Sequence, residues 1–345
     1  MFADLGLPAN IGVFAVAATF VWIAGARLAA LADALAERTG LGRALLGLLL
    51  LAGVTSLPEV ATSFTAASIG DAQLAMNNLL GSVVMQVALL AVADFIFSRH
   101  ALTAIVPDPV VMLQGALNVC LLATVAVAAL APEVAFFGAG AWTWGLLAAS
   151  ILSFYKLVEA GGRQPWIASN KTELSKQHGK RELPRGSTPV LIGQIAVVAA
   201  VILAAGAVVA LSGQAIAEQT GLGSSFFGYV FVAISTSLPE ASTVFAAMRR
   251  GLYTMAISDI LGTNILNVTL LFCVDLISSG EPIMRAAGPF VAIAAMLGVV
   301  VTGLFVMGLA ERRDRSYFRA GLDSALVILV YAGGLALLYG LRPNG

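Results

Sequence analysis

The chain consists largely of long apolar stretches separated by short polar segments. A transmembrane helix needs about 20 mostly apolar residues to cross the hydrocarbon core of a bilayer. Ten stretches meet this requirement, at about residues 11–32, 43–68, 74–97, 109–131, 134–158, 189–214, 222–248, 253–277, 286–309 and 321–341. The pattern therefore predicts an all-α membrane protein with ten transmembrane helices.

Composition supports this interpretation. Of the 345 residues, 59% are hydrophobic and 11% are charged, whereas soluble domains carry about 25% charged residues. The first apolar stretch has no basic segment before it and is longer than a signal-peptide core, so we expect it to be retained. We expect an integral protein of a bacterial inner membrane or another plasma membrane, surrounded by lipid, without a cofactor or a nucleic-acid partner. The sequence does not determine the oligomeric state.

Basic residues set the predicted orientation, because Lys and Arg concentrate in cytoplasmic loops. With the N-terminus outside, every Lys and Arg except Arg285 and Arg342 lies in an inward-facing loop or near the inner end of a span. Both termini are then outside. Residues 161–188 are rich in Lys, Arg, Gly and Pro, and we expect a cytosolic linker there, because a regulatory calcium domain would need clustered acids.

The second half of the chain repeats the first at a shift of 181 residues. The sequence A-E-R-T-G-L-G at 36–42 aligns with A-E-Q-T-G-L-G at 217–223, and T-S-L-P-E at 55–59 recurs at 236–240. Because five predicted spans precede the second copy, the halves enter the membrane from opposite sides, as in the inverted repeats of secondary transporters. We expect five-helix repeats at 1–160 and 189–345, with an ion site near the midplane where they meet.

Glu59 and Glu240 end the two repeated motifs inside apolar spans. A carboxylate at the centre of a membrane helix costs at least about 2.5–3.5 kcal/mol, so such acids mark functional sites by default. Each glutamate follows a proline, which cannot donate to the carbonyl four residues earlier. We therefore expect a break in both helices, with freed carbonyls at Val54 and Ser235 and a cavity or ligand to satisfy them.

Polar residues around the glutamates repeat at the same shift. Carboxylate, hydroxyl and carbonyl oxygens are the ligands of hard cations. The predicted cation-binding side chains are Thr55, Ser56, Glu59, Ser82 and Gln86 in the first half and Thr236, Ser237, Glu240, Thr263 and Asn267 in the second. Asp259 is a third intramembrane acid whose matched residue is the neutral Asn78. Either ion binding or structural hydrogen bonding would explain this pair.

Other matched residues have simpler explanations. Asp94 and Asp275 lie near the ends of their spans, where we expect the carboxylates to reach water. Gly81 and Gly262 are expected to allow close helix packing rather than to bind an ion. Both histidines lie in predicted loops and no H-E-x-x-H motif occurs, which argues against a zinc hydrolase.

The two T-S-L-P-E copies, each followed by a G-S or G-T step, resemble the alpha repeats of the cation/calcium antiporters, specifically the sodium/calcium exchanger type. The resemblance covers about 24–94 and 205–275, with motif cores at 52–86 and 233–267. It implies ten helices, a midplane ion site and alternating access by sliding of the first and sixth helices. It also implies that Glu59 and Glu240 bind calcium in competition with sodium, and that the backbone of Ala52 and Ala233 adds oxygen ligands.

The chain departs from this family pattern at several positions. In the first copy, Asn77 stands for a glycine, Val83 for an asparagine and Gln86 for a second asparagine. In the second copy, Asp259 stands for an asparagine. Asn267 occupies a position where potassium-dependent members tend to have Asp, which favours independence from potassium. These changes keep both glutamates and alter the residues around them.

The sequence therefore predicts a secondary active transporter that exchanges calcium for sodium by alternating access. Two carboxylates can be neutralised by one divalent ion or by several monovalent ions, so the ions compete for one site. Two alternatives stay open: an antiporter that uses protons as the counter-ion, with Asp259 as the titrating group, and a passive cation channel. A membrane enzyme is disfavoured, because no Ser-His pair, His-rich metal site or phosphate loop is visible.

Overall fold

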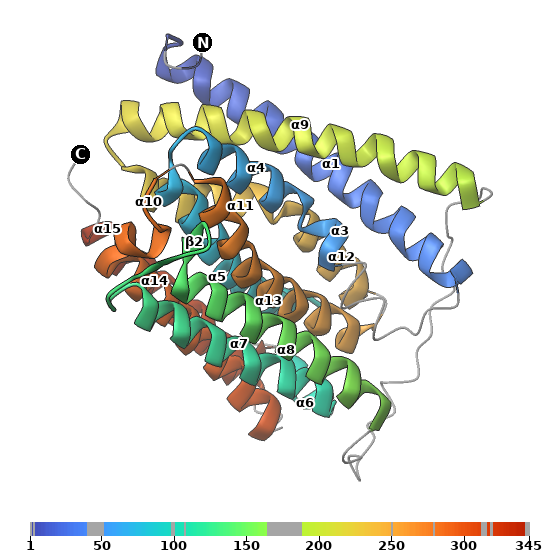
Figure 1. Ribbon diagram of the computed structural model, residues 1–345. Helices are drawn as coiled ribbons and strands as arrows, with labels where there is room; N and C mark the ends of the chain where they lie inside the picture. Colours follow the sequence, from blue (N-terminus) through green and yellow to red (C-terminus); the bar gives the residue numbers. More distant parts are fainter. Residues whose placement is uncertain are drawn as a thin grey trace.

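The computed structural model describes residues 2, 4–39, 52–97, 101–106, 108–163, 188–249, 251–278, 280–311, 316–317 and 320–341. In this part of the chain, eight helices are long and apolar enough to cross a membrane. They are α1 (Leu7–Thr39), α5 (Ala72–Phe97), α7 (Pro109–Ala128), α8 (Ala141–Arg163), α9 (Thr188–Thr220), α13 (Tyr253–Ile277), α14 (Ile283–Glu311) and α15 (Leu322–Gly340). The protein is an all-helical membrane protein (Figure 1).

A bent pair of helical segments forms a further candidate span. Its first arm consists of α10 (Ser224–Phe227), the π-helical turn η3 (Gly228–Val232) and α11 (Ala233–Thr236), and its second arm is α12 (Leu238–Arg249), inclined by 48°. The second predicted span is described only from α3 (Ala52–Thr55) and α4 (Leu57–Ser68) onward. Its remainder, 43–51, and the core of the predicted linker, 164–187, lie outside the described residues. The count of ten spans therefore stays a prediction.

Short elements connect the long helices. They are α6 (Leu102–Ile105) and two antiparallel hairpins, β1 (Ala135–Phe136) with β2 (Ala139–Gly140), and β3 (Ser316–Tyr317) with β4 (Ala320–Gly321). The first hairpin corrects the predicted helix at 134–158, which begins only at Ala141. Phe137 and Gly138 have φ angles of 45° and 81°, and this left-handed backbone turns the chain before the helix can start.

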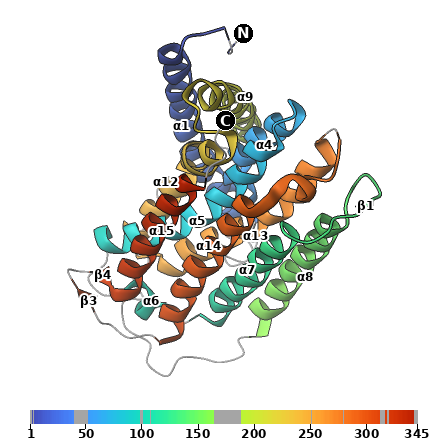
Figure 2. The same ribbon diagram turned by 90° about the vertical axis from the view of Figure 1, so that its left-hand side faces the viewer.

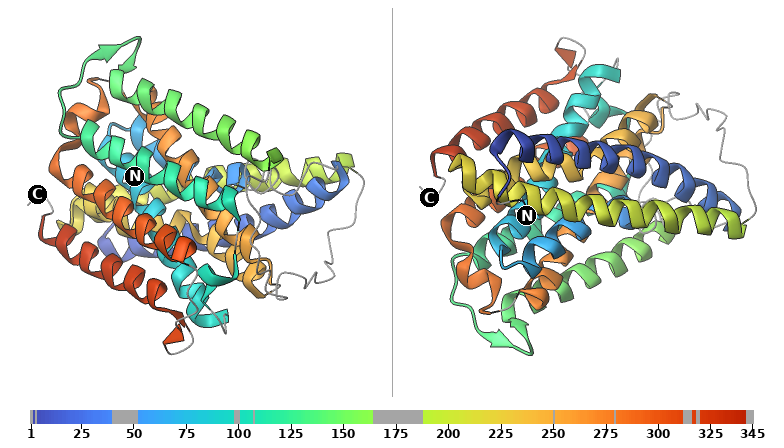
Figure 3. Two further views of the ribbon diagram at one scale, coloured as in Figure 1. Left: turned by 90° about the horizontal axis from the view of Figure 1, so that it is seen from below. Right: turned by 90° about the horizontal axis from the view of Figure 1, so that it is seen from above.

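Helices α1 and α9 pack side by side along one face of the molecule (Figures 1 and 3). α1 also packs against α3, α11 and α12, whereas α9 packs against α4, α10 and η3. Figure 2 shows α7, α8, α14 and α15 on the side away from this pair. The start of α1 and the end of α15 lie toward the same end of the bundle (Figure 1). This arrangement fits termini on one side of the membrane, although which side stays a prediction.

α5 and α13 cross at the centre of the protein. The side-chain amide of Asn264 donates to the carbonyl of Val83 at 3.4 Å, and these two residues are matched at the 181-residue shift. A contact between equivalent residues is what a two-fold axis between two copies produces. The sequence repeat is therefore reflected in the packing of its two central helices.

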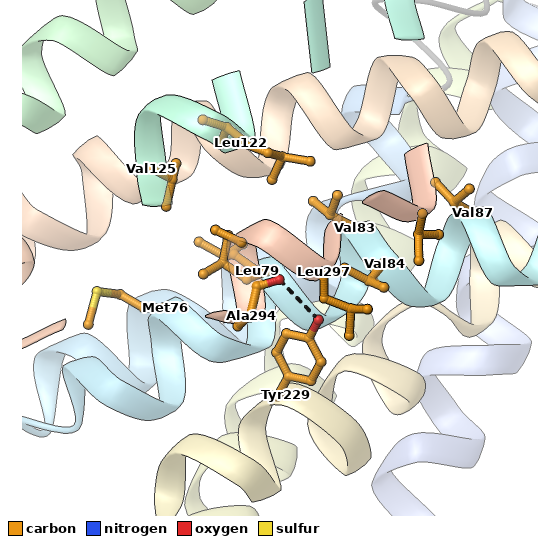
Figure 4. Packing of buried hydrophobic residues seen from close by; sticks show 14 of the residues in the cluster. Met76, Leu79, Val83, Val84, Val87, Leu122, Val125, Tyr229, Ala294 and Leu297 are labelled. Carbon is orange, nitrogen blue, oxygen red and sulfur yellow. Dashed lines mark hydrogen bonds between the residues drawn. The ribbon is translucent and has the colours of Figure 1, made fainter. Parts of the chain in front are cut away.

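α5 also makes a close contact with η3. A Cβ added at Gly81 would lie 2.0 Å from the carbonyl oxygen of Tyr229, so only glycine fits there. Figure 4 shows the ring of Tyr229 among apolar side chains of α5 and α14, with its hydroxyl donating to the carbonyl of Ala294 at 3.3 Å. The prediction that Gly81 allows close packing is thus confirmed.

Asp94, at the end of α5, is buried and accepts hydrogen bonds from groups where α6 and α15 begin. Its Oδ1 accepts from the backbone N–H of Leu102 at 2.9 Å, and its Oδ2 accepts from the N–H of Gly321 at 3.2 Å and the hydroxyl of Ser324 at 2.8 Å. The first N–H groups of a helix have no partner within that helix. Asp94 supplies such partners where α6 and α15 begin.

Asp275, at the end of α13, makes the matched set of contacts. It accepts from the N–H of Ile283 at 2.8 Å, the N–H of Gly140 at 2.7 Å and the hydroxyl of Thr143 at 2.5 Å. The exposed fractions of Asp94 and Asp275 are 0% and 3%. The expectation that these carboxylates reach water is therefore wrong, because helix starts from the rest of the bundle cover both of them.

Candidate functional site

The two T-S-L-P-E motifs form matched breaks in the helices. α3 ends at Thr55 and α4 begins at Leu57, with Ser56 between them at φ −77° and ψ 2°. In the second half Ser237 takes the same place at φ −87° and ψ 12°. The proline is then the second residue of the following helix. The first N–H groups of a helix make no hydrogen bond within that helix, so a proline is tolerated there. The predicted interruptions are present in both halves.

Every predicted side chain of the cation site that carries a polar group is buried. The breaks meet at α5 and α13: α3 and α4 pack against α13, α11 and α12 pack against α5, and α4 contacts α11. These polar residues therefore come from the two broken helices, α3–α4 and α11–α12, and from α5 and α13. Polar side chains gathered inside a membrane bundle are costly unless they pair or bind an ion.

Glu59 faces hydroxyl groups of the other half. The Ser237 hydroxyl donates to Oε1 of Glu59 at 3.0 Å, and the side-chain amide of Gln86 donates to the Ser237 hydroxyl at 3.1 Å. Ser82 and Thr236 lie beside the same carboxylate. Oε2 of Glu59 is buried and has no hydrogen-bond partner within the described residues. This oxygen is therefore available to bind a ligand.

Glu240 occupies the matched position, and neither of its buried carboxylate oxygens has a hydrogen-bond partner in the described part of the chain. Thr55 of the opposite break lies next to it, and the carboxylates of Glu59 and Asp259 act on it electrostatically. An unpaired charge buried at low dielectric costs several kcal/mol or more. The pair Glu59 and Glu240 is therefore the candidate site for a bound cation.

The matched residues Asn78 and Asp259 have different contacts. Oδ1 of Asn78 accepts from the Thr236 hydroxyl at 3.1 Å, and its amide donates to the Ser63 hydroxyl at 3.0 Å. Oδ2 of Asp259 accepts from the Thr243 hydroxyl at 2.9 Å, whereas its Oδ1 is buried without a partner among the described residues. Asn78 is a structural link between the breaks, and Asp259 retains one oxygen for a cation or a proton.

The remaining predicted ligands are placed less uniformly. Thr263 and Asn267 are buried on α13, and their side-chain polar atoms have no hydrogen-bond partner in the described structure. The carbonyl of Ala233 accepts from the N–H of Ser237 at 3.1 Å and the hydroxyl of Thr236 at 3.3 Å, so it stabilises the break. Ala52 is the first residue of α3.

Within the described ranges, no three side chains of His, Cys, Asp or Glu converge on one point. A Ca²⁺ ion takes about 6–8 oxygen ligands. A site built on Glu59 and Glu240 would therefore complete its ligand set from hydroxyl, amide and backbone oxygens. Buried hydroxyl groups are available from Thr55, Ser82, Thr236, Ser237 and Thr263, and buried side-chain amides from Gln86 and Asn267.

Sequence reasoning missed Ser63 and Thr243, which hold Asn78 and Asp259. They lie at i+4 from Glu59 and i+3 from Glu240, so helical spacing places each on the face of its glutamate. They do not match one another at the 181-residue shift. Ser63 aligns with Val244, so a search restricted to repeated positions would miss it, whereas Thr243 aligns with Thr62 and could have been found.

Comparison with known proteins identifies the family. The sequence model of the family described as "Sodium/calcium exchanger protein" matches residues 9–158 and 190–340. The chain belongs to the sodium/calcium exchanger family. It is 28% identical over 265 residues to the inner membrane protein YrbG of Escherichia coli (strain K12), covering 74% of this chain and 76% of that relative. It is 25% identical over 316 residues to the "Putative antiporter CaxA" of Alkalimonas amylolytica, covering 89% and 92% of the two chains.

Solved structures of the sodium-calcium exchanger NCX_Mj have the same fold as this exchanger-family protein. The form soaked with 2.5 mM Na⁺ and 0.1 mM Sr²⁺ matches with a TM-score of 0.63 at 16% identity, covering 96% of this chain and 99% of that one. The form soaked with 2.5 mM Na⁺ and 0.1 mM Ca²⁺ matches with a TM-score of 0.61 at 17% identity, covering 95% and 98%. The sequence resemblance to cation/calcium antiporters is confirmed.

Proposed function

We propose that this protein is a cation antiporter that exchanges Ca²⁺ for Na⁺ at a site centred on Glu59 and Glu240. The observation that carries this proposal is the pair of fully buried carboxylates at matched helix breaks, each beside hydroxyl groups of the opposite half. Membership of the sodium/calcium exchanger family and similarity to a named antiporter support it.

Charge balance explains why one site would serve both ions. One Ca²⁺ neutralises the charge of both glutamates, and so do two Na⁺ ions, so occupation by one kind excludes the other. Removing all cations would leave buried negative charges unpaired, at a cost of several kcal/mol. The empty site would therefore be disfavoured as the protein changes access from one side to the other, which favours exchange over leak.

The inverted repeat gives the site equivalent routes to the two membrane faces. Each half supplies one break, one glutamate and one neighbouring helix, so rearrangement of one half against the other opens the same site to either side. A channel would need a continuous open path across the membrane. The inverted repeat and the buried glutamates favour alternating access instead. The inner-membrane location of the relative YrbG supports a bacterial inner membrane for this protein too.

Equilibrium binding to the purified protein tests the proposal. Wild-type protein should bind Ca²⁺, and added Na⁺ should raise the apparent Kd, whereas added choline should not. Glu59→Gln and Glu240→Gln should each lose this binding. Glu218→Gln changes an exposed glutamate at the end of α9 and should behave as wild type. Wild-type Ca²⁺ affinity in both buried-glutamate variants would remove the basis of the proposal.

Oδ1 of buried Asp259 has no hydrogen-bond partner within the described residues. This supports one variant of the function, in which protons replace sodium as the counter-ion. Ca²⁺ efflux from vesicles driven by a sodium gradient should be compared with efflux driven by a pH step. Asp259→Asn keeps an oxygen that can accept from Thr243 and removes the charge. Efflux that follows the pH step in wild type but not in Asp259→Asn would favour the proton-coupled variant.

A further inference from the structure

Helices α1 and α9 each carry a glycine that is pressed against a broken helix. Gly25 and Gly206 are matched at the 181-residue shift. A Cβ added at Gly25 would lie 2.1 Å from Cγ and 2.5 Å from Cβ of Pro239. A Cβ added at Gly206 would lie 2.6 Å from the Cβ of Ala61 and 3.4 Å from the carbonyl oxygen of Pro58. Both positions therefore require the absence of a side chain.

The residues in these contacts flank the two glutamates. Pro239 immediately precedes Glu240, and Pro58 and Ala61 lie on either side of Glu59. The glycine of each long helix thus contacts the break of the opposite half: Gly25 of the first repeat meets the second break, and Gly206 of the second repeat meets the first. No residue of α1 or α9 needs to touch a cation to influence where the carboxylates lie.

A hydrogen bond reinforces the contact in the first break. The hydroxyl of Thr62 donates to the carbonyl of Gly206 at 3.1 Å, and Thr62 is fully buried. Thr62 belongs to the same turn of α4 as Ala61 and Glu59. A buried hydroxyl without a partner costs about 1–3 kcal/mol, so this bond stabilises the position of α9 along α4 in the described conformation.

The glycines nearer the starts of the same two helices lack such contacts, whereas a Cβ at Gly213 in α9 would lie 3.3 Å from side-chain carbons of α10 and η3. Cβ atoms added at Gly12 in α1 and at Gly193 in α9 have no heavy atom within 4 Å. A small residue is therefore not a general requirement along these helices. Close approach is required at Gly25 and Gly206, where the helix faces a glutamate-bearing break.

We propose that Gly25 and Gly206 are positioning residues for cation binding: α1 sets the position of Glu240 through Pro239, and α9 sets the position of Glu59 through Pro58 and Ala61. This inference rests on the proposed role of the two glutamates. The absence of a side chain at each glycine allows the first turn of the broken helix to pack closely against α1 or α9. The distance between these helices then sets how far the carboxylate extends toward the opposite half. Displacements of about 1 Å are enough to degrade a preorganised site.

The test is a methyl exchange between two facing positions. Gly206→Ala adds a methyl group against Ala61, and Ala61→Gly removes the methyl group that it would meet. We expect Gly206→Ala to weaken Ca²⁺ binding by about tenfold or more, since overpacking of this kind costs about 1–3 kcal/mol. The double variant Gly206→Ala with Ala61→Gly should recover most of the affinity. Gly193→Ala and Gly12→Ala are the matched controls and should bind Ca²⁺ as wild type does.

Affinity is measured on the folded protein and compared with the thermal midpoint of the same sample. A purely structural role for Gly206 would lower the midpoint and leave the Ca²⁺ affinity of the folded protein unchanged, and that result would overturn the inference. A double variant as weak as Gly206→Ala would overturn it too. If Gly206→Ala yields no folded protein, Thr62→Val is used instead, because it removes the hydrogen bond to Gly206 at similar side-chain volume. A lower Ca²⁺ affinity of the folded variant would support the inference, and a lower thermal midpoint with unchanged affinity would overturn it.

These outcomes are separable from failure of the proposed function. Loss of Ca²⁺ binding in Glu59→Gln and Glu240→Gln, together with wild-type affinity in Gly206→Ala, would remove only the positioning role. Wild-type Ca²⁺ binding in both glutamate variants would remove the site itself, and with it the reason for positioning.

Discussion

The Ser237 hydroxyl and the Glu59 carboxylate are joined by a hydrogen bond of 3.0 Å, although the two residues lie 178 positions apart and belong to different halves of the chain. Gln86 donates to the same hydroxyl at 3.1 Å from a third helical segment. The break of one repeat therefore helps to hold the glutamate of the other. Neither half alone contains a complete site.

Ser237→Ala tests this relationship. A hydrogen bond to a charged group is worth about 1.5–3 kcal/mol, so losing it should weaken Ca²⁺ binding by about tenfold or more. Ser68→Ala is the control, because Ser68 is exposed at the end of α4 and its hydroxyl donates to the carbonyl of Thr65 in its own helix. Equal affinities in the two variants would show that Ser237 does not support Glu59.

Gly81→Ala tests the packing that places α5 beside the second break. An added Cβ would lie 2.0 Å from the carbonyl oxygen of Tyr229, and backbone cannot rotate away as a side chain can. We expect a loss of at least about 1–3 kcal/mol in stability, measured by thermal unfolding in detergent. Gly145→Ala on α8 meets no atom within 4 Å and should be neutral or stabilising. Similar midpoints for the two variants would contradict this packing.

Asp94→Ala tests the contacts at the start of α6 and α15. The substitution leaves the N–H groups of Leu102 and Gly321 and the hydroxyl of Ser324 without their acceptor. Each buried donor left unpaired costs about 1–3 kcal/mol, so the unfolding midpoint should fall markedly. Ca²⁺ affinity of the protein that remains folded should stay unchanged, because Asp94 lies at the end of its helix, away from the breaks.

The control for Asp94 is Glu281→Ala. The Glu281 side chain is 71% exposed and pairs with Arg285 at 3.0 Å. Exposed ion pairs contribute about 0–1 kcal/mol, so the midpoint should change little. A midpoint for Asp94→Ala as high as that of Glu281→Ala would mean that the three donors find other partners.

The sequence was sufficient to predict the parts of the site that depend on local chemistry. Proline before Glu59 and Glu240 removes a backbone donor and so favours a kink or break within a span, and the repeat shows that both glutamates lie in equivalent settings. The family resemblance drew on the same residues. The structure adds that the two breaks face each other, so that Ser237 meets Glu59 and Thr55 meets Glu240.

Other features could not be predicted, because they depend on distant partners. The donors to Asp94 from α15 lie 227 and 230 residues away, and no local pattern indicates them. Water access was the expectation for a carboxylate at a helix end, and tertiary contacts replaced the water. The hairpin at 135–140 was missed because its turn depends on the φ angles of Phe137 and Gly138 within an otherwise apolar stretch.

The central claim is coupled exchange at Glu59 and Glu240, and Ca²⁺ uptake into proteoliposomes tests it most directly. Vesicles loaded with sodium, potassium or choline are compared at equal pH, with Glu240→Gln as the site variant and Glu218→Gln as the exposed control. We predict that uptake requires internal sodium, disappears in Glu240→Gln and persists in Glu218→Gln. Ca²⁺ uptake into choline-loaded vesicles that equals uptake into sodium-loaded vesicles without a pH gradient would contradict the account. Uptake that persists in Glu240→Gln would contradict it too.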